Sequence, residues 1–352
     1  MRNQQTLRVI VLRLSALGDV AMTIPVLWSL ARQYPSVEVV LVSRKFAMGL
    51  TKFLPSVRFV EFDPVGKHKG FFGFYKLYRE LKRMGPWDGV VDLHDVIRTK
   101  LIRFLFGIGR TKVSYIDKGR RDKKQLTRRT NKALRPLKHT VIRYAETFYR
   151  LGYGLKIDVN FKGLFNGPVP MDYDILELIQ SSPSEKWIGI APFAKHIGKS
   201  YPFEKMQEVI RELATIPLVT LILFGAKGSE QDALNRIAGQ YTNVKCLAGL
   251  LSIDKELEVM SNLQLMISMD SANMHLASLA GVPVVSIWGA THPYVGFYGW
   301  GQPADNAVQI DLYCRPCSVF GDKPCYRGDY ACLNSIEPHR VAKEVVRILN
   351  HN

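Results

Sequence analysis

The sequence contains no hydrophobic stretch that could cross a lipid bilayer. A membrane-spanning helix needs about 20 predominantly apolar residues in a row, and no part of the 352-residue chain approaches such a run. The N-terminal stretch 1–6 is polar, and the apolar run that follows it, 7–12, has the length of a strand, which is not the pattern of a secretory signal. We therefore expect a cytoplasmic protein.

Two common nucleotide-binding fingerprints are also absent. No G-x-G-x-x-G accompanies the first expected strand, 7–12, which counts against a nicotinamide or flavin dinucleotide site. No G-x-x-x-x-G-K-[ST] occurs, which counts against a P-loop nucleotidase.

Acidic residues are scarce: 31 Asp and Glu stand against 48 Lys and Arg, for a net charge of +17. The excess is concentrated in residues 98–143, where 16 Lys and Arg are accompanied only by Asp117 and Asp122, so this segment carries +14 and the rest of the chain +3. Such a concentration indicates an anionic partner: lipid head groups, a phosphorylated glycolipid or nucleic acid. Leu101, Phe104 and Phe106 are interleaved with the basic residues, which favours contact with a membrane surface.

The residues that are present describe a globular α/β protein. The chain is 47% hydrophobic and 22% charged, and its length favours two domains. Strand-length apolar runs alternate with helical patterns in two series, separated by a Gly- and Pro-rich stretch at 155–171 that we predict to be the linker. We expect two Rossmann-like parallel-sheet domains facing across a cleft, with a C-terminal helix at 338–349. We expect the domains to span 1–160 and 161–352, the second with a Cys-rich loop before its final helix.

The most informative stretch is 264–289, which has the pattern strand, polar turn, helix, strand. Its turn, 270–273, lies at the carboxyl end of a strand, where open α/β sheets bind ligands. Ser271 can cap the helix, and the free N–H groups behind it form a small anion site. His275 falls one turn along. A phosphate-bearing ligand fits this arrangement.

Three motifs together resemble the heptosyltransferases, a family of glycosyltransferases with the two-Rossmann GT-B fold (glycosyltransferase family 9). The first is R-L-S-A-L-G-D-V-A-M-T-I-P at 13–25, the second is K-S-Y-P-F at 199–203, and the third is D-S-A-N-M-H-L-A at 270–277, followed by G-V-P at 281–283 and W-G at 288–289. They occur in the family's order across nearly the whole chain. Two positions depart from the usual pattern: Tyr201 replaces Trp, and Ala272 replaces Gly. In addition, residues 193–196 lack a hydroxyl pair that some members place near the diphosphate.

The resemblance implies an inverting, metal-independent transferase that moves a heptose or related sugar from an ADP-sugar to the inner core of lipopolysaccharide. It places the catalytic base on Asp19. Such a reaction needs a base for the acceptor hydroxyl and positive charge for the leaving diphosphate, and Lys199 is our candidate for the second role.

The resemblance implies that domain 1–160 binds the acceptor and that domain 161–352 binds the nucleotide-sugar, and we assign the remaining site residues to these two substrates. We expect the donor to contact the backbone N–H groups of 271–273, with further contacts from side chains on the same domain: Lys195, Glu230, Asp270, Ser271, Ala272, Asn273 and His275. Lys195 and His196 would replace the missing hydroxyl pair. We expect the acceptor to contact the first loop and two cations of the basic segment: Arg13, Ser15, Gly18, Arg98 and Arg120.

Five cysteines remain. Cys246 lies in an apolar strand, whereas Cys314, Cys317, Cys325 and Cys332 form C-x2-C-x7-C-x6-C, which resembles a zinc-site count in a cytosolic protein. The sequence does not decide whether a structural zinc ion binds to these four cysteines. Such an ion would not be catalytic. No cofactor is expected to be required, and no Asp-x-Asp motif stands at a strand end for a catalytic metal.

Two other functions remain open from the sequence. A nucleotide-sugar epimerase would share the fold but would leave the basic segment unexplained. A non-enzymatic nucleic-acid-binding protein would use that segment and would bind in a strongly salt-dependent manner, although no nucleic-acid-binding motif supports it. Our preferred prediction is a peripheral protein of the inner membrane's cytoplasmic face, with an ADP-sugar and an anionic lipid A-core acceptor as partners and no nucleic acid.

Overall fold

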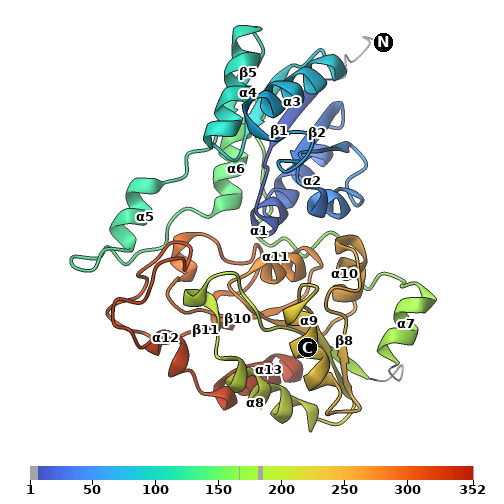
Figure 1. Ribbon diagram of the computed structural model, residues 1–352, viewed down its shortest axis with the longest axis vertical. Coiled ribbons are helices and arrows are strands. Elements are labelled where there is room, and N and C mark those ends of the chain that lie inside the picture. Colours follow the sequence, from blue (N-terminus) through green and yellow to red (C-terminus); the bar gives the residue numbers. More distant parts are fainter. Residues whose placement is uncertain (1–6, 166, 181–184, 352) are drawn as a thin grey trace. The chain divides into compact units, whose positions relative to one another are not determined.

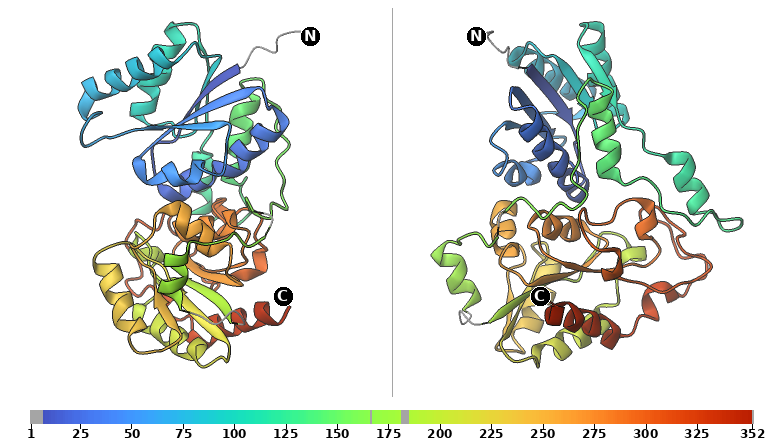
Figure 2. Two further views of the ribbon diagram at one scale, coloured as in Figure 1. Left: turned by 90° about the vertical axis from the view of Figure 1, so that its right-hand side faces the viewer. Right: turned by 180° about the vertical axis from the view of Figure 1, so that it is seen from behind.

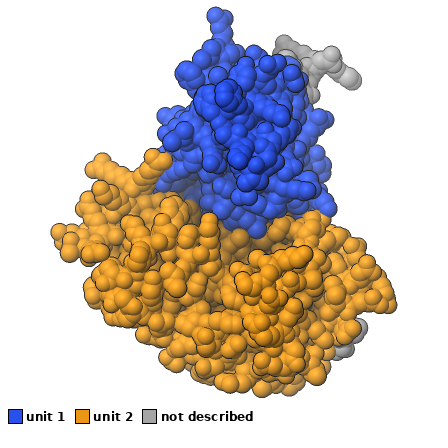
Figure 3. Space-filling view, viewed as in Figure 1, with its two compact units in different colours: residues 1–118, 139–159 blue, residues 119–138, 160–352 orange. Residues whose placement is uncertain are grey.

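The computed structural model describes residues 7–165, 167–180 and 185–351, and the chain divides into two compact units. The first unit contains Met1–Lys118 and His139–Val159, and the second contains Gly119–Lys138 and Asn160–Asn352 (Figure 3). Each unit is built on its own sheet of parallel strands (Figure 1). None of the helices in the described ranges combines the length and the apolar character that spanning a bilayer requires.

The first unit has a five-stranded sheet in the order β3-β2-β1-β4-β5. Its central strands are mainly apolar because helices cover both faces of the sheet (Figure 2). One layer contains α2 packed on α6, and the other contains α3 packed on α4. The strands are β1 (Leu7–Leu12), β2 (Val37–Ser43), β3 (Val57–Glu61), β4 (Gly89–Asp92) and β5 (Lys112–Tyr115), and the helices are α1 (Leu17–Ala21), α2 (Ile24–Gln33), α3 (Gly70–Met84), α4 (Ile97–Ile108) and α6 (Thr140–Tyr149).

The helix after β1 is interrupted, as Pro25 indicates. α1 ends at Ala21 and α2 begins at Ile24, so Pro25 stands in the first turn of α2, where its missing N–H breaks no helical hydrogen bond. The Thr23 hydroxyl donates to the Val20 carbonyl at 2.6 Å within the break. The short α1 holds Asp19 close to the end of β1.

One helical segment of this unit is not an α-helix. The structure has a 3-10 helix, η1, at Lys45–Thr51. Pro55 disfavours the helical conformation for Leu54, the residue before it, and so limits how far the segment can continue as a helix.

The second unit has a six-stranded sheet in the order β11-β10-β9-β6-β7-β8. The strands are β6 (Lys186–Ala191), β7 (Val219–Leu223), β8 (Val244–Cys246), β9 (Leu265–Met269), β10 (Val284–Ile287) and β11 (Ala307–Val308). The α-helices are α5 (Arg120–Leu126), α7 (Tyr173–Ile179), α8 (Phe203–Ala214), α9 (Ser229–Ala238), α10 (Ile253–Met260), α11 (Ala272–Leu279), α12 (Ala331–Asn334) and α13 (Pro338–His351). Short 3-10 helices complete it: η2 (Ile197–Lys199), η3 (Pro293–Val295) and η4 (Ala304–Asn306).

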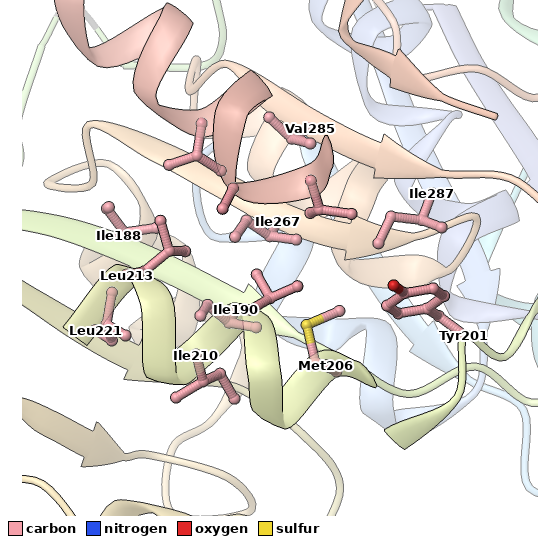
Figure 4. Close-up of a cluster of buried hydrophobic side chains, with 14 of the residues drawn as sticks. Ile188, Ile190, Tyr201, Met206, Ile210, Leu213, Leu221, Ile267, Val285 and Ile287 are labelled. Atoms are coloured by element: carbon pink, nitrogen blue, oxygen red, sulfur yellow. The ribbon is translucent and has the colours of Figure 1, made fainter. Parts of the chain in front are cut away.

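The main core of this unit lies where α8 and the expected C-terminal helix α13 pack together on the sheet (Figure 4). Ile188, Ile190 and Ile267 are fully buried beneath these helices. Tyr201 closes one end of the cluster, and its hydroxyl donates to the Ile336 carbonyl at 2.8 Å, just before α13 begins. The core therefore fixes both α13 and the segment that follows Lys199.

Residues 119–138, the middle of the basic segment 98–143, belong to the second unit, although an uninterrupted first domain of 1–160 was expected. Polar and cation–π contacts explain this position. The Lys132 ammonium donates to the carbonyls of Cys314 (2.7 Å) and Pro316 (3.0 Å), and the Lys123 ammonium lies 4.1 Å from the Phe297 ring centroid. Hydrophobic periodicity does not reveal hydrogen bonds or cation–π contacts, so the sequence pattern could not predict that 119–138 belongs to the second unit.

Candidate functional site

The expected catalytic residues follow strands at which each sheet reverses its order. In parallel α/β sheets, ligands bind beyond the carboxyl ends of the strands at such a reversal. The reversal lies between β1 and β4 in the first sheet and between β6 and β9 in the second. Asp19 follows β1, Lys199 follows β6, and Asp270 directly follows β9. Each unit thus has its own candidate site.

In the first unit, Asp19 forms an ion pair with Arg13. The Arg13 side chain is buried, and its Nη1 also donates to the Leu93 carbonyl at 2.9 Å, beyond the end of β4. Burial alone would lower the pKa of Arg13, but the Asp19 carboxylate raises it, with a net increase. Arg13 therefore stays charged and fixes the orientation of Asp19, whose side chain remains about a third exposed (29%).

His94 extends this cluster from the end of β4. Its Nδ1 accepts a hydrogen bond from the Leu14 N–H at 3.3 Å. Burial, together with the charges of Arg13 and Lys118, lowers the pKa of His94 to about 3. The imidazole is consequently neutral at physiological pH. The sequence motifs did not point to His94, although its position after the strand at 89–92 could have done so.

The expected acceptor residues are divided between the two units. Ser15 and Gly18 lie with Arg13 in the loop and helix after β1. Arg98 is exposed at the start of α4, with its guanidinium 5.6 Å from the Phe74 ring centroid. Arg120 is exposed at the start of α5 and belongs to the second unit.

In the second unit, the predicted Lys199 and Asp270 form a direct ion pair. The Lys199 Nζ lies 2.8 Å from the Asp270 Oδ2, and the two side chains are 14% and 3% exposed. The Thr291 hydroxyl donates to the same carboxylate oxygen at 2.8 Å. Asp270 thus holds Lys199 and a buried hydroxyl at the end of β9.

The turn at 270–273 leads into α11 as expected, but Ser271 does not cap it with its side chain. Ser271 occupies the N-cap position without a side-chain cap hydrogen bond, and its hydroxyl lies 3.2 Å from the Ser268 hydroxyl. Because Ser268 at the strand end offers a hydroxyl partner, the side chain of Ser271 turns toward it. Ala272 and Asn273 begin the helix, and His275 is buried one turn along it.

Two further donor candidates have separate environments. The Glu230 carboxylate accepts a hydrogen bond from the Ala226 N–H at 2.7 Å and so closes the loop after β7. Lys195 is exposed in the loop between β6 and η2, and His196 stands at the N-cap of η2.

The four clustered cysteines line one small cavity of about 10 Å³, which is about the space of one water molecule. All are free thiols, and burial raises the pKa of Cys332 to about 11. Within the described residues, no three His, Cys, Asp or Glu side chains are arranged to hold a metal ion.

Comparison with known proteins places these features in context. The family model described as glycosyltransferase family 9 (heptosyltransferase) matches residues 74–325. Lipooligosaccharide heptosyltransferase 2 of Campylobacter jejuni is 22% identical over 341 residues, covering 96% of this chain and 96% of that protein.

Solved structures share the architecture. A glycosyl transferase family 9 protein from Veillonella parvula superposes with a TM-score of 0.74 at 20% identity, over 99% of both chains. The heptosyltransferase WaaC of Escherichia coli, solved with ADP, gives a TM-score of 0.67 at 18% identity, over 97% of this chain and 100% of that one. The GT-B fold class expected from the motifs, with its two parallel-sheet domains and C-terminal helix, is therefore confirmed.

Proposed function

Because the chain belongs to glycosyltransferase family 9, we propose that it is an inverting glycosyltransferase that moves a heptose or related sugar from an ADP-sugar to the inner core of lipopolysaccharide. The observation that carries this proposal is the Lys199–Asp270 ion pair at the strand-order reversal of the second sheet. It puts a fixed ammonium group beside the start of α11, where backbone N–H groups also face outward. A diphosphate fits this combination of charge and donors.

The reaction divides its tasks between the two units. Asp19 takes the proton from the acceptor hydroxyl, whose oxygen then bonds to the anomeric carbon as the bond to the diphosphate breaks. Lys199 and the N–H groups of 271–273 stabilise the negative charge that develops on the departing ADP. No metal ion is required in this scheme.

The relatives support the proposed donor and acceptor. WaaC was solved with ADP, and the Campylobacter jejuni relative is named a lipooligosaccharide heptosyltransferase. Both support an ADP-sugar and an anionic lipid-linked acceptor for this chain.

The membrane assignment rests on the surface of the first unit. Large apolar side chains are exposed on α3 and α4, among them Phe71, Phe72 and Phe104. The same two helices carry exposed Lys and Arg residues, including Lys76 and Lys100. Aromatic side chains among cations suit an anionic lipid surface, so the protein associates peripherally with the cytoplasmic face of the inner membrane.

Nucleotide binding is the first test. Calorimetric titrations of the purified protein with ADP, UDP and GDP, each with and without EDTA, should give selective ADP binding that EDTA does not change. Tighter binding of UDP or GDP would rule out the ADP-sugar. Loss of ADP binding with EDTA would contradict metal independence.

The catalytic assignment is tested by Asp19→Asn. The substitution preserves size but removes the base, and general-base catalysis contributes roughly 100- to 10,000-fold. Transfer from ADP-heptose to a lipid A–Kdo acceptor should therefore fall by at least about 100-fold while ADP affinity stays unchanged. Thermal unfolding serves as the control, because the change also leaves Arg13 without its partner carboxylate. Full transfer by a folded variant would rule out Asp19 as the base.

A further inference from the structure

Lys199 is held at both ends of its side chain by parts of the chain far away in sequence. A lysine side chain has a flexible four-carbon stem, and a fixed ammonium position requires contacts along it. At the tip, the ammonium pairs with Asp270, and Thr291 orients the shared carboxylate oxygen. The Thr291 side chain is fully buried, so this hydrogen bond is shielded from water.

Arg315 anchors the segment that carries Thr291. Its Nη2 donates to the Thr291 carbonyl at 3.0 Å, and its Nε donates to the Gly289 carbonyl at 2.6 Å. The guanidinium is buried, with 3% of the residue exposed. Arg315 lies within the Cys-rich loop between Cys314 and Cys317, so this loop is tied directly to the residues behind Asp270.

The same loop lies against the stem of Lys199. Gly321 has a φ of +74°, and a Cβ added there would stand 2.6 Å from the Lys199 Cγ. The Gly321 carbonyl accepts from the Gly198 N–H at 3.2 Å, next to Lys199. Ser318 forms the turn, because its buried hydroxyl accepts from the Gly321 N–H at 2.9 Å and donates to Asp322 at 2.8 Å.

We propose that Thr291 and the turn 315–322 are positioning elements that hold the Lys199 ammonium where the diphosphate of the donor binds. They do not touch the substrate and act only through Lys199 and Asp270. A cation fixed before substrate arrives needs no reorganisation when charge develops on the leaving group. This gives the first part of the Cys-rich loop a role in donor binding, and it rests on the proposed role of Lys199.

The glycines of the loop offer a matched pair of variants. Gly321→Ala places a methyl group against Lys199, whereas Gly328→Ala, at a similar φ of +82°, meets nothing within 4 Å. Both variants bear the same left-handed backbone strain. We expect Gly321→Ala to weaken ADP binding by at least about 10-fold in calorimetry, and Gly328→Ala to bind like the wild type. Equal affinities of the two folded variants would overturn the proposal.

Thr291 provides a second, independent pair. Thr291→Val keeps the shape but removes the donor to Asp270, and Thr291→Ser restores the hydroxyl. We expect Thr291→Val to weaken ADP binding and to raise the KM for the sugar donor, and Thr291→Ser to recover most of the loss. An unchanged ADP affinity in folded Thr291→Val would contradict the proposal, even if Gly321→Ala failed to fold.

A Lys199→Ala background separates positioning from simple structural damage. If Thr291 and Gly321 act through Lys199, adding either substitution to Lys199→Ala should cause no further loss of ADP affinity. Additive losses would overturn the proposal while leaving the role of Lys199 intact. Wild-type ADP affinity in Lys199→Ala itself would instead remove the role proposed for Lys199, and this inference with it.

Discussion

Glu256 is a buried carboxyl on α10, and burial raises its pKa to about 7. Its folded pKa lies above the ordinary 4.5, so the folded state keeps a proton that the unfolded chain releases between these values. Stability is therefore greatest with respect to this group below about pH 4.5 and declines as the pH rises to 7. One pKa unit corresponds to about 1.4 kcal/mol, so the total loss is about 3 kcal/mol.

Glu256→Gln should remove this pH dependence, because the amide stays neutral. In urea unfolding, we expect the variant to gain stability over the wild type at pH 8, by up to about 3 kcal/mol more than at pH 5. Glu208→Gln, an exposed position of α8, should show no such pH-dependent gain. An equal gain at both pH values would contradict a raised pKa for Glu256.

For single residues, the sequence pointed to side chains that belong to motifs. It did not point to the side chains that hydrogen-bond to those motif residues and hold them in place. Lys199 and Asp270 were assigned from motifs and form an ion pair. Thr291 was not assigned, because a threonine four residues after the end of β10 has no distinctive chemistry until a carboxylate is found beside it. For Ser271 the sequence predicted a contact that the structure lacks. Serine commonly caps helices, but the Ser271 hydroxyl lies beside the Ser268 hydroxyl instead of capping α11.

At the scale of the elements, α3 contains a glycine, Gly73, at a position where the preceding turn leaves no room for a side chain. A Cβ at Gly73 would lie 2.1 Å from the carbonyl carbon of His68, which is main chain and cannot rotate away. Gly107, in the last turn of α4, has open space around the same position. Because α3 and α4 pack against each other, Gly73 and Gly107 are suitable for direct comparison.

Gly73→Ala should destabilise the protein by about 1–3 kcal/mol, as is usual for a steric clash in a packed region. Gly107→Ala should be neutral or stabilising by up to about 1 kcal/mol, because alanine is the better helix former. Chemical denaturation of both variants at one pH checks the difference. Equal effects would mean that the turn before α3 yields easily to the methyl group.

The central strands could be predicted because they are mainly apolar runs, such as β7 and β9. α8 was also detectable, since Met206, Val209, Ile210 and Leu213 recur at helical spacing and are buried. The 3-10 form of η1 could not be derived from the hydrophobic pattern, which does not distinguish a short 3-10 helix from a short α-helix.

At the scale of the whole molecule, the positively charged residues fall into two groups with different roles. Within 119–138, several cations serve the second unit itself: Lys123 and Arg129 lie over aromatic rings, and Lys132 binds carbonyls. The basic and apolar face of α3 and α4 is a different surface, and we expect it to carry membrane binding.

Sedimentation with vesicles of phosphatidylglycerol and phosphatidylethanolamine tests this expectation. Binding should fall as the NaCl concentration rises, because salt screens the attraction between Lys or Arg and anionic lipids. The double variant Phe71→Ser, Phe72→Ser should bind less than the wild type. Leu176→Ser, an exposed apolar position on α7 among acidic neighbours, should bind like the wild type. Equal binding by both variants would exclude the α3 surface.

The assignment of 119–138 to the second unit has a consequence for any attempt to divide the gene. The polypeptide passes from one unit to the other at three places, 118–119, 138–139 and 159–160. A fragment ending at 159 would carry Lys123 and Lys132 without Phe297 and the carbonyls they bind. A fragment starting at 160 would lack those cations. Independent expression of either half therefore requires moving 119–138, joined by new linkers, from the first coding segment to the second.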